Sequence, residues 1–574
     1  MLARIRLYVL LALLPGLACR GFGEERTLSL LPPTSSGCVE AAVRLPVAAR
    51  LRLAWQPAEP GIAPHPAALE VWSHRAGEPG ELLRTIPFST GSRELSVTVD
   101  LGAPPGEVRM LRVSPNSPVT WKRADLVGRT RGGEPPAWRV EPRRGAPNVL
   151  VYLIDTLRPD VLGSYGGPGP TPTLDRLAGG GVLFERAYST SSWTRPAVAS
   201  LFSGLPVSAH QVGSEAFSLP ESALTLAERF RLLGYQTAGV IANGHVLPSL
   251  HFDQGFETYD WPPFPDQVGS TWEPAAVTAN PAAGEVHRLA LRRLTESRDR
   301  RRPLFLYVHV VDPHQPYRPP EWVLGEKRPA ENVNNFLLRS INEGEEGSPQ
   351  LLADLALAYR GAVAYADREL GRFLAQLGTL VDLDQTVILV VSDHGEAFFE
   401  HRFVGHRNWL YEELTRVPMI LRGPGIPAGR REVAPVSLLD VVPTLLALAE
   451  PGSRPAGRVP GVNLLAPGAG SRLAGRAVPS EFGTGAALVR GEWKLTYHGE
   501  DPEGLRFRLY DLREDPAEDD DRFGREPEVA RQLQAALRAW QATARRLALP
   551  ALPVEVARLG SGLRENLRAL GYVK

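Results

Sequence analysis

The pattern of apolar and polar positions changes twice along the chain, and each stretch predicts a different kind of structure. Over residues 25–145, short alternating runs such as RLRLAW, LEVWS and ELSVTVDL are separated by clusters of proline and glycine, a pattern typical of a small β-sandwich. From residue 148, continuous apolar runs such as NVLVYLI, LFLYVHV and TVILVVS alternate with helical patterns at 222–233, 351–377 and 438–449. Apolar strands that alternate with helices predict an α/β domain over 148–470, built on a mostly parallel sheet flanked by helices.

The pattern changes again in the last hundred residues. The runs ALVRGEWKLTYH and RFRLYDL favour antiparallel strands, and residues 527–546 have the period of an amphipathic helix. We therefore expect a small C-terminal subdomain of antiparallel sheet and helix, with a tail, over 475–574. The N-terminal β-sandwich has no pattern typical of catalysis, and we expect it to be a spacer or a ligand-binding accessory module.

The first residues, MLARIRLYVLLALLPGLACRG, place two arginines before an apolar run and small residues before Cys19. This order predicts a secretory signal peptide over residues 1–24, and the apolar run is too short to span a membrane. Two outcomes stay open, cleavage near Ala18 or lipidation of Cys19, and the second would attach the protein to a membrane. In either case we expect an exported bacterial protein, periplasmic or held at the cell surface as a lipoprotein.

The composition restricts the chemistry. The chain has 64 basic and 64 acidic residues and a formal net charge of zero. Nucleic-acid binders usually carry a basic excess, so nucleic acid is not expected as a partner. Lysine occurs only at positions 122, 327, 494 and 574, which leaves few lysines for chemistry.

Two of the apolar strands are followed by acidic residues. Asp155 comes directly after NVLVYLI, and Asp393 and His394 come directly after TVILVVS. In an open α/β sheet, ligands bind beyond the carboxyl ends of the strands, where these side chains would meet. Two carboxylates and an imidazole are suitable ligands for a divalent cation. A polar residue can also simply end a buried strand, but the pair of strand ends favours a metal site.

A hydroxyl-rich loop, YSTSSWTRPAVASLFSG, lies between these two strands and runs into a predicted helix. Thr194 precedes Pro196 at the start of this helix, an arrangement that fits a threonine N-cap. The same arrangement places the hydroxyl at the positive end of the helix dipole, where a bound cation would lower its pKa and make it a nucleophile. The two interpretations are compatible.

Several segments together resemble the sulfatases of the alkaline phosphatase superfamily, over about residues 148–520. They are NVLVYLIDTLRPDVLGSYG, STSSWTRPAVASLFSGL, HVVDPHQPY, VVSDHGEAF, GHRNWLYEELTRVPMILRGPG and LVRGEWKLTYH. The resemblance implies an alkaline-phosphatase-like α/β catalytic domain and a smaller C-terminal subdomain. It implies that Asp155, Asp393 and His394 bind the metal and that His314 contacts the anionic group. Thr194 occupies the position that becomes formylglycine in sulfatases.

The chain also departs from the sulfatase pattern. Threonine cannot be converted to formylglycine, Val198 replaces the motif arginine, and Thr156 replaces the second aspartate. The Gly-Lys-Trp-His-like motif is replaced by a segment that holds Asn243 and His245. The motif lysine before Leu-Tyr-Glu is matched by Arg407, or functionally by His406. The resulting set resembles the branches of the superfamily that use a threonine nucleophile, including phosphodiesterases and lipoteichoic acid synthases.

From this resemblance we expect a metal-dependent hydrolase that cleaves sulfate- or phosphate-type esters of small molecules or glycans. Thr194 would be the nucleophile and a metal ligand, and the other roles would fall to His314, His406 and Arg407 in catalysis and to Arg195, Asn243 and His245 in substrate binding. The expected cofactor is one divalent ion, Mn²⁺, Zn²⁺ or Ca²⁺, and a second ion at Asp312, His314 and His406 is left open. The alternatives are a catalytically inactive protein that binds glycans or anions, and a phospho-group transferase.

Overall fold

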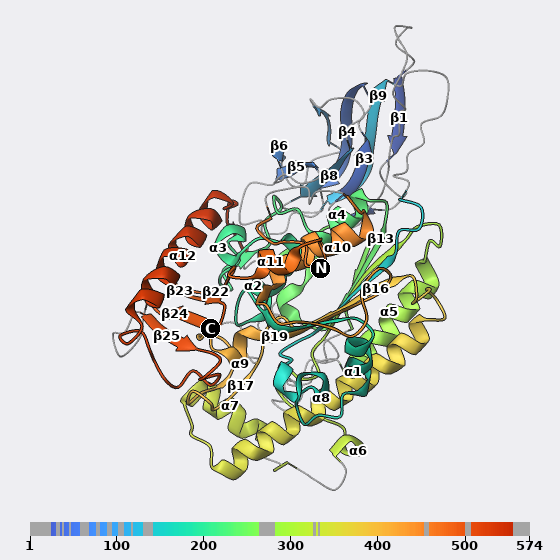
Figure 1. Cartoon of the computed structure of the whole chain (residues 1–574). Coiled ribbons are helices and arrows are strands. Elements are labelled where there is room, and N and C mark those ends of the chain that lie inside the picture. The colour runs from blue at the N-terminus through green and yellow to red at the C-terminus, as the bar shows by residue number, and fades with distance from the viewer. Residues whose placement is uncertain are drawn as a thin grey trace.

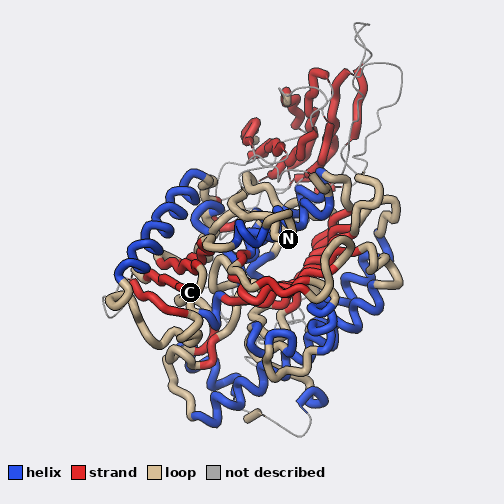
Figure 2. The backbone as a smooth tube through the Cα atoms, viewed as in Figure 1, coloured by secondary structure: helices blue, strands red, loops and turns tan. Residues whose placement is uncertain are grey.

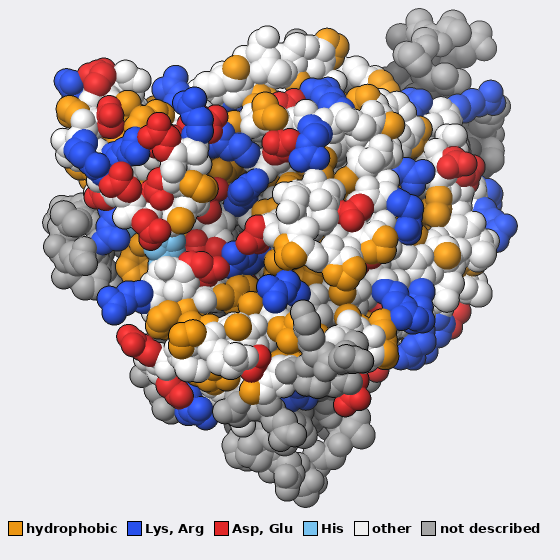
Figure 3. All heavy atoms as spheres, turned by 60° about the horizontal axis from the view of Figure 1, so that its bottom comes forward, with side chains coloured by type: hydrophobic (Ala, Val, Ile, Leu, Met, Phe, Trp, Pro, Cys, Tyr) orange, Lys and Arg blue, Asp and Glu red, His pale blue; other side chains and the backbone are white. Residues whose placement is uncertain are grey.

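The computed structural model describes residues 25–29, 35–36, 39–44, 47–57, 68–75, 81–88, 95–101, 108–115, 119–129, 142–262, 282–324, 329–330, 333–452, 459–499 and 507–554. The expected signal peptide, with Cys19, lies outside these ranges. Within them, no helix has the length and apolar character needed to cross a membrane. Figure 3 shows acidic and basic side chains intermixed over one face of the molecule, in keeping with the zero net charge.

The N-terminal region forms a β-sandwich of two antiparallel sheets (Figure 1). One sheet has the order β1–β9–β4–β7 with β2 paired to β9, and the other has the order β3–β8–β5–β6. Leu51 and Trp55 of the first sheet and Val71 and Val113 of the second belong to one buried core. The strands are β1 (Glu25–Ser29), β2 (Ser35–Ser36), β3 (Val39–Arg44), β4 (Val47–Pro57), β5 (Ala68–Arg75), β6 (Glu81–Pro87), β7 (Leu95–Asp100), β8 (Val108–Pro115) and β9 (Val119–Arg129).

The large α/β domain is built on a mixed, mostly parallel sheet. Its strand order is β14–β13–β15–β10–β16–β19–β11–β20, with β21 paired to β11. β19 is antiparallel to both of its neighbours, whereas β10 is parallel to β15 and β16. The strands are β10 (Asn148–Ile154), β11 (Val182–Tyr188), β13 (Gln236–Ile241), β14 (Thr258–Asp260), β15 (Leu304–Val310), β16 (Thr386–Val391), β19 (Arg416–Arg422), β20 (Arg430–Glu432) and β21 (Val436–Ser437). The expected α/β fold class is confirmed.

Helices cover both faces of this sheet (Figures 1 and 2). α2, α4 and α10 pack on one face in one core, and α1, α5, α7 and α8 pack on the other face in a second core. Thr225 and Glu228 form a capping box that begins α4, and Ser348 caps α8 ahead of Pro349. The helices are α1 (Pro172–Gly179), α2 (Thr194–Ser203), α3 (Val207–His210), α4 (Leu226–Leu232), α5 (Ala283–Ser297), α6 (Glu321–Leu324), α7 (Val333–Glu343), α8 (Pro349–Leu377), α9 (Glu412–Thr415), α10 (Val441–Ala449) and α11 (Ala469–Leu473).

A four-stranded antiparallel sheet and a long helix form the C-terminal subdomain, with a core that they share. Lys494 of this sheet is buried and lies 3.0 Å from the carboxylates of both Glu412 and Glu518, which ties the subdomain to α9. Its elements are β22 (Ala477–Phe482), β23 (Gly485–Arg490), β24 (Trp493–Tyr497), β25 (Phe507–Asp511) and α12 (Pro527–Arg546), and the short pairs are β12 (Phe217–Ser218) with β26 (Leu552–Pro553) and β17 (Ala397–Phe398) with β18 (Val404–Gly405).

An ionic cluster joins the β-sandwich to the α/β domain. Arg112 of β8 is buried, and its guanidinium donates to the carboxylates of Glu221 and Glu228 and, at 2.8 Å, to Oε1 of Gln254. Glu228 is also the capping-box residue of α4, so the same carboxylate serves the helix start and the contact between domains. Removing one partner of such a pair leaves a buried charge uncompensated, so the contact is costly to break.

Candidate functional site

Three neighbouring strands bring acidic and imidazole side chains to the carboxyl edge of the sheet. β10 lies between β15 and β16 and is parallel to both. Asp155 follows β10, His309 lies near the end of β15, and Asp393 and His394 follow β16. All four are buried, and ligand atoms of Asp155, His309 and Asp393 lie within 4.8 Å of one another. The edge that the sequence predicted as a metal site is therefore where these groups meet.

The orientation of His394 shows that hydrogen-bond acceptors converge there. Its Nδ1 lies 2.9 Å from the carbonyl oxygen of Gly395, so Nδ1 carries the proton and Nε2 presents a lone pair. This Nε2 lies 3.4 Å from Oδ2 of Asp393 and 3.6 Å from Oδ1 of Asp155. Both of these carboxylate oxygens are buried and have no hydrogen-bond partner among the described residues. Two buried carboxylate oxygens without donors, beside the lone pair of an imidazole, fit a cation.

The pKa values of Asp155 and Asp393 are shifted in opposite directions. Burial and the neighbouring Asp155 raise the pKa of Asp393 well above its ordinary value. Burial works in the same direction on Asp155, but a hydrogen bond from His309 at 3.1 Å and the nearby His314 hold the pKa of Asp155 below its ordinary value. Two carboxylates that repel each other in a buried site are stabilised together by a divalent cation.

The hydroxyl of Thr194 faces this cluster and does not cap α2. The N-cap position belongs to Trp193, and no side chain donates or accepts a capping bond at this helix start, so the predicted threonine cap is wrong. Oγ1 of Thr194 instead lies 3.3 Å from Nε2 of His394 and 3.4 Å from Nδ2 of Asn243. Asn243 also donates to Oδ2 of Asp155 at 2.6 Å. The hydroxyl thus lies at the positive end of α2, beside the carboxylates.

Two further histidines line the other side of the cluster. The ring centre of His406 lies 4.5 Å from that of His394 and 5.0 Å from that of His314. Nδ1 of His314 donates to the carbonyl oxygen of Gln315 at 2.6 Å, and Nδ1 of His406 lies 2.8 Å from Oε1 of Glu396. Burial, with His394 and His314 nearby, holds the pKa of His406 well below its ordinary value, so the ring is neutral.

The wall next to Thr194 carries the predicted substrate-binding residues. Both ring nitrogens of His245 face arginines: Nδ1 lies 3.2 Å from Nη2 of Arg195, and Nε2 lies 3.3 Å from Nη2 of Arg407. Glu215 accepts from both arginines, with its backbone oxygen from Arg195 and with Oε1 from Arg407, each at 2.8 Å. The guanidinium of Arg407 also lies 4.7 Å from the ring centre of Trp193. The structure therefore brings the sequence-predicted residues Arg195, His245 and Arg407 together in one cluster.

Comparison with known proteins assigns the chain to a family. The pattern of the family named Sulfatase matches residues 147–451, more than half of the chain. The chain belongs to the sulfatase family. Choline-sulfatase of Rhizobium meliloti (strain 1021) is 29% identical to this sulfatase-family chain over 434 residues, which cover 65% of this chain and 82% of the relative.

Two solved structures share the fold of this sulfatase-family chain. BT4656 in complex with its substrate D-glucosamine-2-N,6-O-disulfate has a TM-score of 0.57 at 19% identity, and the match covers 70% of this chain and 98% of that one. The phosphonate monoester hydrolase of Agrobacterium radiobacter has a TM-score of 0.54 at 23% identity, over 72% of this chain and 98% of the other. The resemblance drawn from the motifs is confirmed, and with it the alkaline-phosphatase-like fold and the assignment to the sulfuric ester hydrolases.

Three residues of the candidate site were not predicted from the sequence. His309 lies inside the apolar run LFLYVHV, and the signal that points to it is an imidazole near the carboxyl end of a buried strand. Glu396 and Glu215 are found only through their contacts with His406 and Arg407. Asp312, considered for a second ion, accepts from the backbone N of Ala283 at the start of α5.

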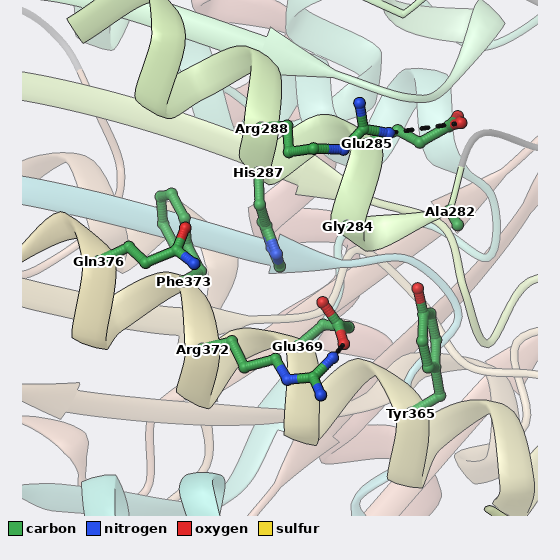
Figure 4. A pocket seen from close by; sticks show the side chains of 10 residues that line it. All are labelled: Ala282, Gly284, Glu285, His287, Arg288, Tyr365, Glu369, Arg372, Phe373 and Gln376. Carbon is green, nitrogen blue, oxygen red and sulfur yellow. Dashed lines mark hydrogen bonds and ion pairs between the residues drawn. The ribbon is translucent and has the colours of Figure 1, made fainter. Parts of the chain in front are cut away.

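A separate groove lies between α5 and α8 and is shown in Figure 4. It has a volume of about 460 Å³, and none of the site residues above lines it. His287 in this groove contacts the hydroxyl of Tyr152 at 2.8 Å and stacks on Phe373, and Glu369 pairs with Arg372 at 2.6 Å. Nδ1 of His287 is buried without a hydrogen-bond partner among the described residues, but the groove holds no carboxylate or imidazole besides Glu285, Glu369 and His287, and it lies apart from the sheet edge.

Proposed function

We propose that this sulfatase-family enzyme hydrolyses sulfate- or phosphate-type esters through the hydroxyl of Thr194. The observation that carries the proposal is the position of Oγ1: it is not used as a helix cap, and it lies 3.3 Å from His394 and 3.4 Å from Asn243. A buried hydroxyl at the positive end of a helix, next to two carboxylates, is suited to become a nucleophile.

A divalent cation fits the acceptor set of Asp155, Asp393 and His394, with Thr194 and His309 as neighbouring ligands. The nitrogen ligands favour a borderline ion such as Mn²⁺ or Zn²⁺ over Ca²⁺. Such an ion, when bound, would offset charge on a non-bridging oxygen of the ester and favour the ionised form of the hydroxyl.

The protein residues account for the remaining steps. Oγ1 of Thr194, after its proton has passed to solvent water, forms a bond to sulfur or phosphorus as the bond to the leaving oxygen breaks, and the electron pair leaves with that oxygen. His406 or Arg407 stabilises the leaving oxygen, while His314, Asn243, His245 and Arg195 orient the anion. Water then attacks the threonyl ester, which regenerates the hydroxyl and releases sulfate or phosphate.

Glu396 supports His406 in this role. Burial raises the pKa of Glu396 well above its ordinary value, and its Oε1 lies 2.8 Å from Nδ1 of His406. This contact fixes the orientation of the ring, and the tautomer of His406 that carries its proton on Nε2 can donate to the leaving oxygen.

The test is a substrate panel measured with each metal. Aryl sulfate, phosphate monoester, phosphodiester and phosphonate monoester are assayed with Mn²⁺, Zn²⁺ and Ca²⁺, together with choline sulfate and glucosamine disulfate, which the names of the relatives supply. Turnover that requires a metal and is lost in Thr194→Ala supports the proposal. A protein that binds these anions, holds no metal and turns over none of them would instead be an inactive binding protein.

A further inference from the structure

The wall of the site formed by Arg195, His245, Arg407 and Glu215 holds more positive than negative charge. Arg195 is 2% exposed and Arg407 is 23% exposed, so Arg195 is buried and Arg407 lies nearer the mouth. Glu215, at 28% exposure, is the carboxylate that pairs with Arg407. Both guanidinium groups stay ionised in proteins; the carboxylate of Glu215 pairs with Arg407, whereas Arg195 contacts only the backbone oxygen of Glu215.

His245 cannot supply the missing negative charge. Its two ring nitrogens lie 3.2 and 3.3 Å from guanidinium nitrogens, which are donors only. A neutral imidazole accepts at one nitrogen and donates at the other. In one of these two contacts, therefore, the N–H of His245 faces an N–H of an arginine, and no hydrogen bond forms. Burial and the two arginines hold the pKa of His245 well below its ordinary value, which keeps the ring uncharged. The wall thus has a net charge of about one positive unit, which an incoming anion would balance.

We propose that Glu215 is a specificity-determining residue that sets the charge of the ester group this site accepts. With its carboxylate present, the wall complements one negative charge, the charge of a sulfate monoester, a phosphodiester or a phosphonate monoester. A phosphate monoester brings two negative charges, and the second is opposed by Glu215. This inference rests on the proposed function, because it takes the anion to be the ester group beside Thr194.

The size of the effect follows from the linear dependence of Coulomb energy on charge. If removing the charge of Glu215 raises the affinity for a monoanion f-fold, the affinity for a dianion at the same place rises f²-fold. For a partly exposed carboxylate we expect f to be about 3, and hence about tenfold for the dianion. The preference between the two anions therefore changes even if both bind more tightly.

The experiment measures binding without turnover. Methanesulfonate is a tetrahedral monoanion, and methylphosphonate is its dianionic counterpart above its second ionisation; neither has an ester bond that this enzyme could cleave. Their affinities are measured by calorimetry for the metal-loaded wild-type protein and for Glu215→Gln, with Glu215→Ala beside it in case the amide makes new contacts. Glu185→Gln is the matched control, because Glu185 is similarly exposed, at 32%, and is paired with Arg431 at 2.6 Å on β11.

We expect Glu215→Gln and Glu215→Ala to increase the affinity for methylphosphonate more than the affinity for methanesulfonate, and Glu185→Gln to change neither. Equal gains for the two anions, weaker binding of both, or the same shift in Glu185→Gln would overturn the proposal, as would wild-type protein that binds neither anion. Because the readout is binding, a protein with no turnover but with this shift would refute the threonine mechanism and leave the role of Glu215 standing.

Discussion

Replacing Thr194 separates a structural role of its hydroxyl from a chemical one. The side chain is 2% exposed, makes no capping bond and has polar contacts of 3.3 and 3.4 Å, which are long for hydrogen bonds. Thr194→Ala removes a methyl-sized group and these weak contacts, so we expect the free energy of unfolding to fall by about 1 kcal/mol. Turnover should fall by about 10⁴-fold or more, as it does when a covalent nucleophile is removed.

A loss of 10⁴-fold in rate corresponds to about 5 kcal/mol of transition-state stabilisation, which the small change in stability cannot explain. Thr194→Ser is the matched variant: it keeps the oxygen at the start of α2, and we expect measurable turnover at a similar stability. The assay combines initial rates on the substrate panel, urea unfolding and metal content for all three proteins. Mass spectrometry of substrate-quenched wild-type enzyme should show a sulfo or phospho group on the peptide that bears Thr194.

Full activity in Thr194→Ala would refute the reasoning and would move the search to the neighbouring serines. Ser191 already donates its hydroxyl to the backbone oxygen of Glu481, at 2.8 Å. The buried hydroxyl oxygen of Ser192 has no hydrogen-bond partner among the described residues, so Ser192→Ala would be tested next.

Three further outcomes can be measured. His394→Ala should lower the metal content of purified protein more than His314→Ala does, because Nε2 of His394 faces both aspartates; equal losses by elemental analysis would make His314 a ligand as well. Burial raises the pKa of Asp312 to about 7, so the folded state binds this proton more tightly than the unfolded chain, and stability falls as the pH rises from about 4 to above 7. The part of this fall that Asp312 contributes between pH 5 and pH 8, at most about 3 kcal/mol, should be absent in Asp312→Asn when urea unfolding is compared at these two pH values. Arg112→Met should destabilise the protein by about 3–5 kcal/mol, because it leaves the carboxylates of Glu221 and Glu228 buried without their cation. This loss should be seen as faster proteolysis between the domains. An unchanged cleavage rate would show that the ionic cluster does not hold the two domains together.

Continuous apolar runs were enough to predict the central strands and the long helices, because burial on both faces leaves a clear pattern. The run at 304–310 is β15, and the helical period at 527–546 coincides with α12. β11 was not predicted as a strand, because Glu185 and Arg186 interrupt its apolar run at the point where its pairing with β19 shifts register. The antiparallel direction of β19 depends on how the chain returns to the sheet, for which its apolar sequence carries no signal.

The sequence predicted those site residues that follow the end of a strand. It did not predict those that the fold brings together from distant parts of the chain. Asp155 stands directly after β10, and Asp393 follows, after one intervening residue, β16, the strand that pairs with β10. Glu215 meets Arg407 from 192 residues away, so no local pattern could reveal the pair. The cap prediction failed by one residue: the extended backbone that an N-cap needs is found at Trp193, so the hydroxyl of Thr194 is left to face the sheet edge.

In the proposed mechanism, the threonine also determines how the second half of the reaction proceeds. A sulfatase formylglycine hydrate has a second hydroxyl that can expel sulfate by elimination, whereas a threonyl ester has none, and Val198, in place of the motif arginine, is fully buried in the core. Water must therefore attack sulfur or phosphorus directly, and we expect this step to be slow for sulfate. Rapid-quench assays with an aryl sulfate should show a burst of about one phenol per active site before the slow steady rate, and a phosphodiester should show a smaller burst. Linear release of phenol from both, at equal rates, would contradict a slow second step.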